Sequence, residues 1–96
     1  MSMPISRERK LLSEAEFALV APSHHPAVSQ LDREVLVALA RRLREARDAA
    51  RTNLAAMRRA KRGKGEARTG LNDAGTAAKK QVFAAALRRV NKRLDA

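Results

Sequence analysis

A run of sequence without glycine or proline occupies residues 32–62 and reads DREVLVALARRLREARDAARTNLAAMRRAKR. Leucine and alanine recur in it at alternating steps of three and four residues, which is the spacing that places side chains on one face of an α-helix. Asp32 is suited to cap the first turn, and the helix dipole favours the negative charge of Glu34 in that turn. We therefore predict one helix over 32–62, about 45 Å long at 1.5 Å per residue.

The predicted helix carries an apolar seam that weakens toward its C-terminal half. The members of this seam are Leu36, Leu39, Leu43, Ala46, Ala50, Asn53 and Met57. A second helix is expected at 76–94, capped by the hydroxyl of Thr76. Its apolar stripe consists of Phe83, Ala86, Leu87, Val90 and Leu94. Two such seams are typical of an antiparallel helix pair, so we expect an all-α protein built on a helical hairpin.

The segment between the two long helices reads GKGEARTGLNDAG at 63–75 and contains all four glycines of the chain. Because glycine weakens helices, a flexible basic linker is predicted there. No strand is expected before this segment, and it has no GK[ST] ending, so it does not match a phosphate-binding loop. It is interpreted as a hinge.

The N-terminal part has weaker helical signals. Residues 1–12 contain Pro4 and three basic residues, and their apolar residues do not recur at helical spacing. They are predicted to form a flexible tail. Ser13 and Glu16 have the spacing of a capping box, which predicts a short helix over 13–20. Residues 21–30 then form a connection, in which Pro26 can open a single turn. All these parts are expected to form a single small helical domain.

The positive charge is concentrated in the second part of the chain. The net charge is +11, yet residues 1–40 hold four basic and five acidic side chains, whereas residues 41–96 hold seventeen basic and five acidic ones. Such an asymmetry indicates a region that faces a polyanion. Nucleic acid, either DNA or RNA, is therefore the expected partner.

The candidate nucleic-acid-binding residues are arginines and lysines of the two long helices and the linker. They are Arg41, Arg44, Arg47, Arg51, Arg58, Arg59, Lys61, Arg62, Lys64, Arg68, Lys80, Arg88, Arg89, Lys92 and Arg93. Those of the second helix are expected to lie away from its apolar stripe. Arginine forms forked hydrogen bonds to phosphate oxygens, and five carboxylates cannot neutralise seventeen cations.

Other uses of the charge and the seams stay open. The seams could serve a protein-interaction or homo-oligomeric adaptor, with the charge serving an acidic partner or solubility. A homodimer is a related outcome, because a 45 Å helix would leave one end of its seam uncovered. An anionic membrane is a less favoured partner, since the apolar faces are rich in alanine and the chain has no tryptophan.

Nothing in the sequence indicates an enzyme, a cofactor or a small-molecule substrate. Nearly half of the apolar residues are alanine, so a chain of 96 residues builds only a small core. His24 and His25 are adjacent, but a zinc site needs three or four ligands. Ser23 and Ser29 lack a neighbouring base with an orienting acid. The two histidines are therefore predicted to pack in the connection.

The expected compartment is the cytoplasm. The chain has no cysteine, no signal-peptide apolar region and no run of about 18 apolar residues that could span a membrane. Fifteen arginines against six lysines, together with abundant alanine, are typical of a GC-rich bacterial genome.

Overall fold

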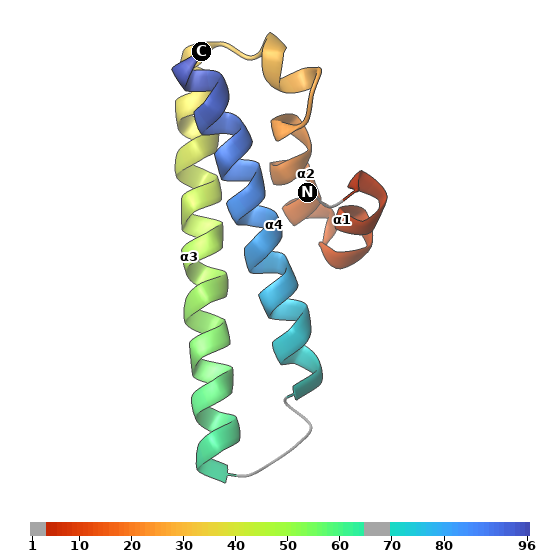
Figure 1. Ribbon diagram of the computed structural model, residues 1–96, viewed down its shortest axis with the longest axis vertical. Coiled ribbons are helices and arrows are strands. Elements are labelled where there is room, and N and C mark those ends of the chain that lie inside the picture. The colour runs from red at the N-terminus through yellow and green to blue at the C-terminus, as the bar shows by residue number, and fades with distance from the viewer. Residues whose placement is uncertain (1–3, 65–69) are drawn as a thin grey trace.

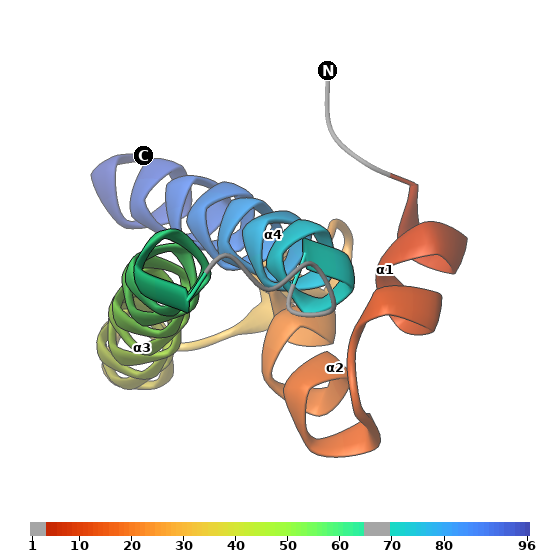
Figure 2. The same cartoon turned by 90° about the horizontal axis from the view of Figure 1, so that it is seen from below.

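The computed structural model describes residues 4–64 and 70–96, and the side chains of 4–59 and 75–96. Its elements are α1 (Ile5–Leu11), α2 (Glu14–Val20), two 3₁₀ turns η1 (Ala21–Ser23) and η2 (Ala27–Gln30), α3 (Arg33–Lys64) and α4 (Gly70–Asp95). Helices α3 and α4 run antiparallel and side by side, and α1 and α2 lie on one side of this pair (Figures 1 and 2). The predicted all-α class and helical hairpin are confirmed.

The core lies between α3 and α4 and continues under the N-terminal segment. Its buried side chains on the two long helices are Leu36, Leu39, Ala40, Leu43, Ala50, Leu54, Val82, Phe83, Ala86, Leu87 and Val90. Leu12, Val20 and Val28 belong to the same buried cluster. The short N-terminal elements are therefore packed onto the hairpin.

The predicted seam is wrong at one position. Asn53 is exposed, and Leu54 beside it is buried with 6% of its surface accessible. The seam thus passes from Ala50 to Leu54 in a step of four and then to Met57 in a step of three. Burying a leucine is favourable, whereas burying an asparagine without a partner costs free energy, and this decides the register.

The N-terminal residues differ most from expectation. Residues 5–11 form α1, so the prediction of a tail over 1–12 is wrong for them. Helix α2 follows as predicted, with a capping box at its start: the Ser13 N–H donates to Glu16 Oε1 at 2.8 Å, and the Glu16 N–H donates to Ser13 Oγ at 3.2 Å. The turn η2 begins directly after Pro26, as expected.

The predicted linker is too long. Helix α3 continues to Lys64 and α4 begins at Gly70, while residues 65–69 lie outside the described residues. Thr76 is not a cap: it lies inside α4, where its hydroxyl donates to Met57 Sδ at 3.6 Å. Such packing between the helices can outweigh the cost of a glycine in a helix, about 1 kcal/mol each. Within the described residues, no helix is long and apolar enough to cross a membrane.

Candidate nucleic-acid interface

Helix α3 has different chemistry on its two flanks. The flank toward α2, which we call the alanine flank, is mainly small and apolar and carries a single arginine: its members are Val35, Ala38, Arg42, Ala46, Ala49 and Asn53. The other, the arginine flank, carries Arg44, Arg47, Arg51 and Arg58. Steps of three, four and seven residues keep these four arginines on one side of the helix. Arg51 is two residues from Ala49, which places the two flanks about half a turn apart.

The arginine flank forms a row of cations about 21 Å long between Arg44 and Arg58, at 1.5 Å per residue. Arg44, Arg51 and Arg58 are exposed. Arg47 is half-buried and donates from Nη2 to Asp48 Oδ1 at 3.1 Å. Three exposed arginines therefore follow one flank of a single helix.

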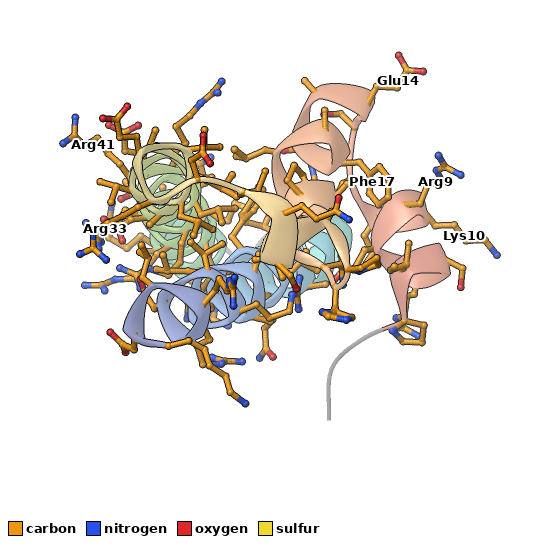
Figure 3. All side chains as sticks on the ribbon, turned by 90° about the horizontal axis from the view of Figure 1, so that it is seen from above. Arg9, Lys10, Glu14, Phe17, Arg33 and Arg41 are labelled. Carbon is orange, nitrogen blue, oxygen red and sulfur yellow. The ribbon has the colours of Figure 1, made fainter. Side chains whose placement is uncertain are left out.

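Further cations stand beside this row on the outer face of α3. Arg41 and Arg59 are exposed. Figure 3 shows Arg33 and Arg41 projecting from α3 on the side away from α1 and α2. The side chains of Lys61, Arg62, Lys64 and Arg68 lie outside the described residues. Exposed cations thus occur both on the arginine flank and on the outer face of the described part of α3.

Helix α4 adds cations at several levels. The contact between Thr76 and Met57 sets the antiparallel register, so Lys80, one turn beyond Thr76, is level with the part of α3 between Arg51 and Arg58. Lys80 is half-buried, and Arg88 and Lys92 are exposed. Arg93 is also exposed, and its Nη2 donates to the Ser29 carbonyl at 3.2 Å, which ties the end of α4 to η2.

Arg89 does not belong to an exposed basic surface, and its assignment there is wrong. Its side chain is 20% exposed and points toward the N-terminal segment. Nη2 donates to Ser23 Oγ at 2.8 Å and lies 3.8 Å from Oε2 of the fully buried Glu8. The physical reason is α1, which was not predicted and which carries Glu8 onto this face of α4.

Charge and burial act against each other at Arg89. Burial lowers the pKa of Arg89 below its ordinary value, the Glu8 carboxylate opposes this, and Arg88 lowers the pKa further. An arginine keeps its proton in proteins, so the guanidinium is a permanent cation that needs the Glu8 carboxylate as its counterion. Arg89 therefore acts as an anchor for α1.

His24 completes this buried cluster. Its Nε2 lies 2.6 Å from Glu8 Oε1 and 3.2 Å from Arg89 Nη2, while His25 Nδ1 meets Ser29 Oγ at 3.0 Å. His24 therefore packs in the connection as predicted, whereas His25 is exposed and contacts Ser29 there. Within the described residues, no group of three or more histidine, cysteine and acidic side chains could hold a metal ion. Sequence reasoning missed Glu8, because a glutamate between two arginines carries no local signal of burial.

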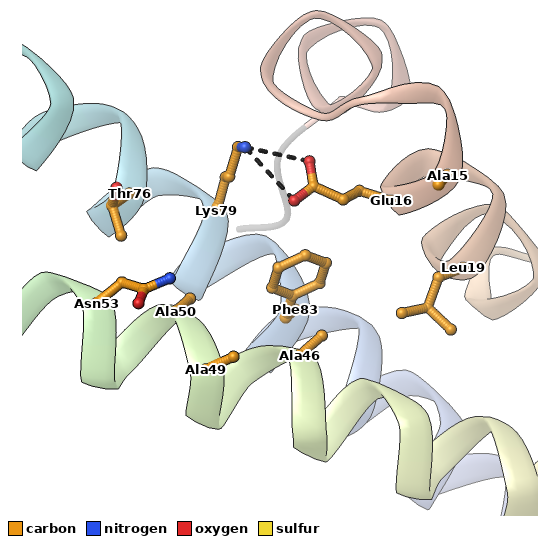
Figure 4. Close-up of a pocket in the computed structure, with 10 residues that line it drawn as sticks. All are labelled: Ala15, Glu16, Leu19, Ala46, Ala49, Ala50, Asn53, Thr76, Lys79 and Phe83. Atoms are coloured by element: carbon orange, nitrogen blue, oxygen red, sulfur yellow. Dashed lines mark hydrogen bonds and ion pairs between the residues drawn. The ribbon is translucent and has the colours of Figure 1, made fainter.

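A hollow of about 390 Å³ lies between α2, α3 and α4 (Figure 4). Ala46, Ala50 and Phe83 line it, and Lys79 Nζ and Glu16 Oε1 form an ion pair of 3.1 Å at its edge. Burial raises the pKa of Glu16, but the hydrogen bond from the Ser13 N–H and the Lys79 ammonium outweigh burial and leave the pKa below its ordinary value. The hollow is thus mainly apolar, with one satisfied ion pair.

Comparison with protein-family models, with curated proteins and with solved structures gave no match to this chain.

Proposed function

We propose that this protein binds nucleic acid, without catalysing a reaction, through the arginine flank of α3 and the exposed cations of α4. The observation that carries the proposal is the one-sided row of Arg44, Arg47, Arg51 and Arg58 on the side of α3 opposite α2. A row of cations on one rigid helix can neutralise several phosphates at once, and the release of condensed counterions drives binding. A nucleoid- or ribosome-associated role in a bacterial cytoplasm is the setting that this proposal implies.

The excess of cations supports binding over a purely solubilising surface. On a purely solubilising surface, acidic side chains would pair with the arginines and neutralise much of their charge. Asp48 does pair with Arg47 in this way. Residues 41–96, however, contain seventeen basic side chains and only five acidic ones. Five carboxylates cannot balance seventeen cations, and this excess favours a polyanion as partner.

The proposal is tested by fluorescence anisotropy with labelled DNA and RNA oligomers of mixed sequence. If about five phosphates are engaged, the logarithm of the binding constant should fall with the logarithm of the salt concentration with a slope of about −4. Absence of binding by micromolar protein at about 50 mM salt, where phosphate contacts are strongest, would contradict the proposal.

A matched pair of double variants locates the interface. Arg44→Gln with Arg51→Gln removes two charges from the arginine flank, and Arg7→Gln with Lys10→Gln removes two exposed charges from α1. Glutamine and arginine have similar helix propensities, so the fold should be kept. We expect the first variant to reduce the salt slope by about 1.8 and the second to leave it nearly unchanged. Equal effects of both would place the interface elsewhere.

The alternative, an adaptor that binds a protein partner, is favoured by the alanine flank. A second hollow of about 410 Å³ lies along it, and Val35 at its edge is 47% exposed. Val35→Asp should abolish capture of such a partner while leaving nucleic-acid binding intact. Leu39, Leu43, Phe83 and Val90 are buried between the helices, so their substitution would instead unfold the hairpin.

A further inference from the structure

The two aromatic side chains of the chain are both occupied within the fold. Phe83 is 3% exposed and lies between α3 and α4. Phe17 packs against the core, and the guanidinium carbon of Arg9 lies 5.1 Å from the centre of its ring. The chain has no tryptophan or tyrosine. Proteins that hold single strands stack the bases on aromatic side chains, and here both rings are already covered.

The apolar hollows are also on the wrong side of α3 to receive bases from a strand held by the arginines. Both hollows lie along the alanine flank, between α3 and α2. The arginine flank is about half a turn away, across a helix that is about 10–12 Å wide with its side chains. A single strand with its phosphates on Arg44 and Arg51 would therefore leave its bases in water.

A duplex can bind without aromatic side chains or apolar hollows that receive its bases. Its bases are stacked inside, and its phosphates stand on a rigid outer surface. Duplex DNA carries one charge per 1.7 Å of axis when both strands are counted, so a segment about 21 Å long contains about twelve phosphates, and the row can contact those on the side that faces it. A row of cations on one flank of a rigid helix can therefore lie against several phosphates of a duplex without contacting its bases.

We infer that the arginine flank takes double-stranded nucleic acid and contacts its phosphates rather than its bases. This inference rests on the proposed function and adds the class of nucleic acid to it. Duplex DNA and duplex RNA share the chemistry that the flank recognises, namely a rigid double row of phosphates. Base sequence should therefore have little effect on affinity.

The test compares oligomers of about 24 nucleotides by fluorescence anisotropy at about 100 mM salt, where phosphate contacts still dominate. The probes are one DNA strand, its duplex, a duplex of unrelated sequence, and an RNA duplex with its single strand. We expect at least about tenfold tighter binding of a duplex than of its own strand, and similar affinity for the two DNA sequences. Tighter binding of either the DNA or the RNA duplex than of its strand supports the inference.

Three other outcomes are informative in different ways. Equal or tighter binding of the single strands would overturn the inference and leave the proposed function standing. A preference of more than about tenfold for one DNA sequence would overturn contact through phosphates alone. Binding of none of the probes would instead contradict the proposed function itself. The double variant at Arg44 and Arg51 should weaken both duplexes alike, and loss confined to one sequence would also count against the inference.

Discussion

Oε1 of Glu8 lies 2.6 Å from Nε2 of His24, and the Glu8 side chain is fully buried. Glu8 comes from α1 and His24 from the connection between η1 and η2, so their contact joins two segments that lie 16 residues apart in the sequence. Arg89 of α4 supplies the positive charge beside them, 3.8 Å from Oε2. Glu8 Oε2 and Arg89 Nη1 are buried and make no hydrogen bond. The cluster therefore holds α1 through the contact between Glu8 and His24 and through the charge of Arg89.

Removal of the Glu8 charge should destabilise the protein. Glu8→Gln keeps the shape of the side chain but leaves the Arg89 guanidinium without its buried counterion, and we expect a loss of about 2–3 kcal/mol. The measurement is urea unfolding at neutral pH. Glu14→Gln is the control, because Glu14 is exposed and its loss from the first turn of α2 should cost less than about 1 kcal/mol. Equal stability of Glu8→Gln and the natural protein would show that the cluster does not hold α1.

Substitution of Arg89 should lower the stability of the protein, whereas substitution of Arg88 should affect only nucleic-acid binding. Arg89→Gln removes the cation beside Glu8 and should lower the free energy of unfolding by about 1–3 kcal/mol. Arg88→Gln changes an exposed side chain and should leave stability within about 0.5 kcal/mol. If α4 takes part in the proposed interface, Arg88→Gln should also reduce the salt slope by about 0.9. Urea unfolding and anisotropy on both variants check this, and a reversed pattern would refute the placement of Arg89.

Glu16 should make stability depend on pH in acid. The pKa of Glu16 in the folded protein lies below its ordinary value of about 4.3. A lowered pKa means that the ionised form stabilises the fold, so this contribution is complete above about pH 5 and is lost as the pH falls through the folded pKa. Unfolding of the natural protein and of Glu16→Gln should be compared from about pH 6 to pH 3. The natural protein should be the more stable at pH 6, with the difference shrinking toward pH 3. A constant difference would contradict this.

Leu54 and Asn53 test the register of the long hairpin. Leu54→Ala removes a buried side chain and should cost about 2–4 kcal/mol. Asn53→Ala changes an exposed side chain and should alter stability by less than about 0.5 kcal/mol. Thermal unfolding of the two variants gives the answer. Comparable losses of stability in the two variants would show that Asn53 belongs to the buried seam.

Local signals in the sequence determined α2, α3 and the hairpin. The capping box of Ser13 and Glu16 and the spacing of leucines in α3 act between residues three or four apart, so they can be read along the chain. The same holds for the arginine flank, because steps of three, four and seven define one side of any helix. Its predicted members Arg44 and Arg51 are indeed exposed.

Only the tertiary structure decided α1, the extent of α4 and the place of Arg89. Glu8 meets a partner 16 residues away in His24, and Arg89 meets that histidine across 65 residues. No local period encodes such contacts, because the benefit of a buried charge appears only when its partners are brought together. The side of α3 that α2 covers was decided in the same way. Packing of α2 on the alanine flank leaves Arg44 and Arg51 exposed on the other flank.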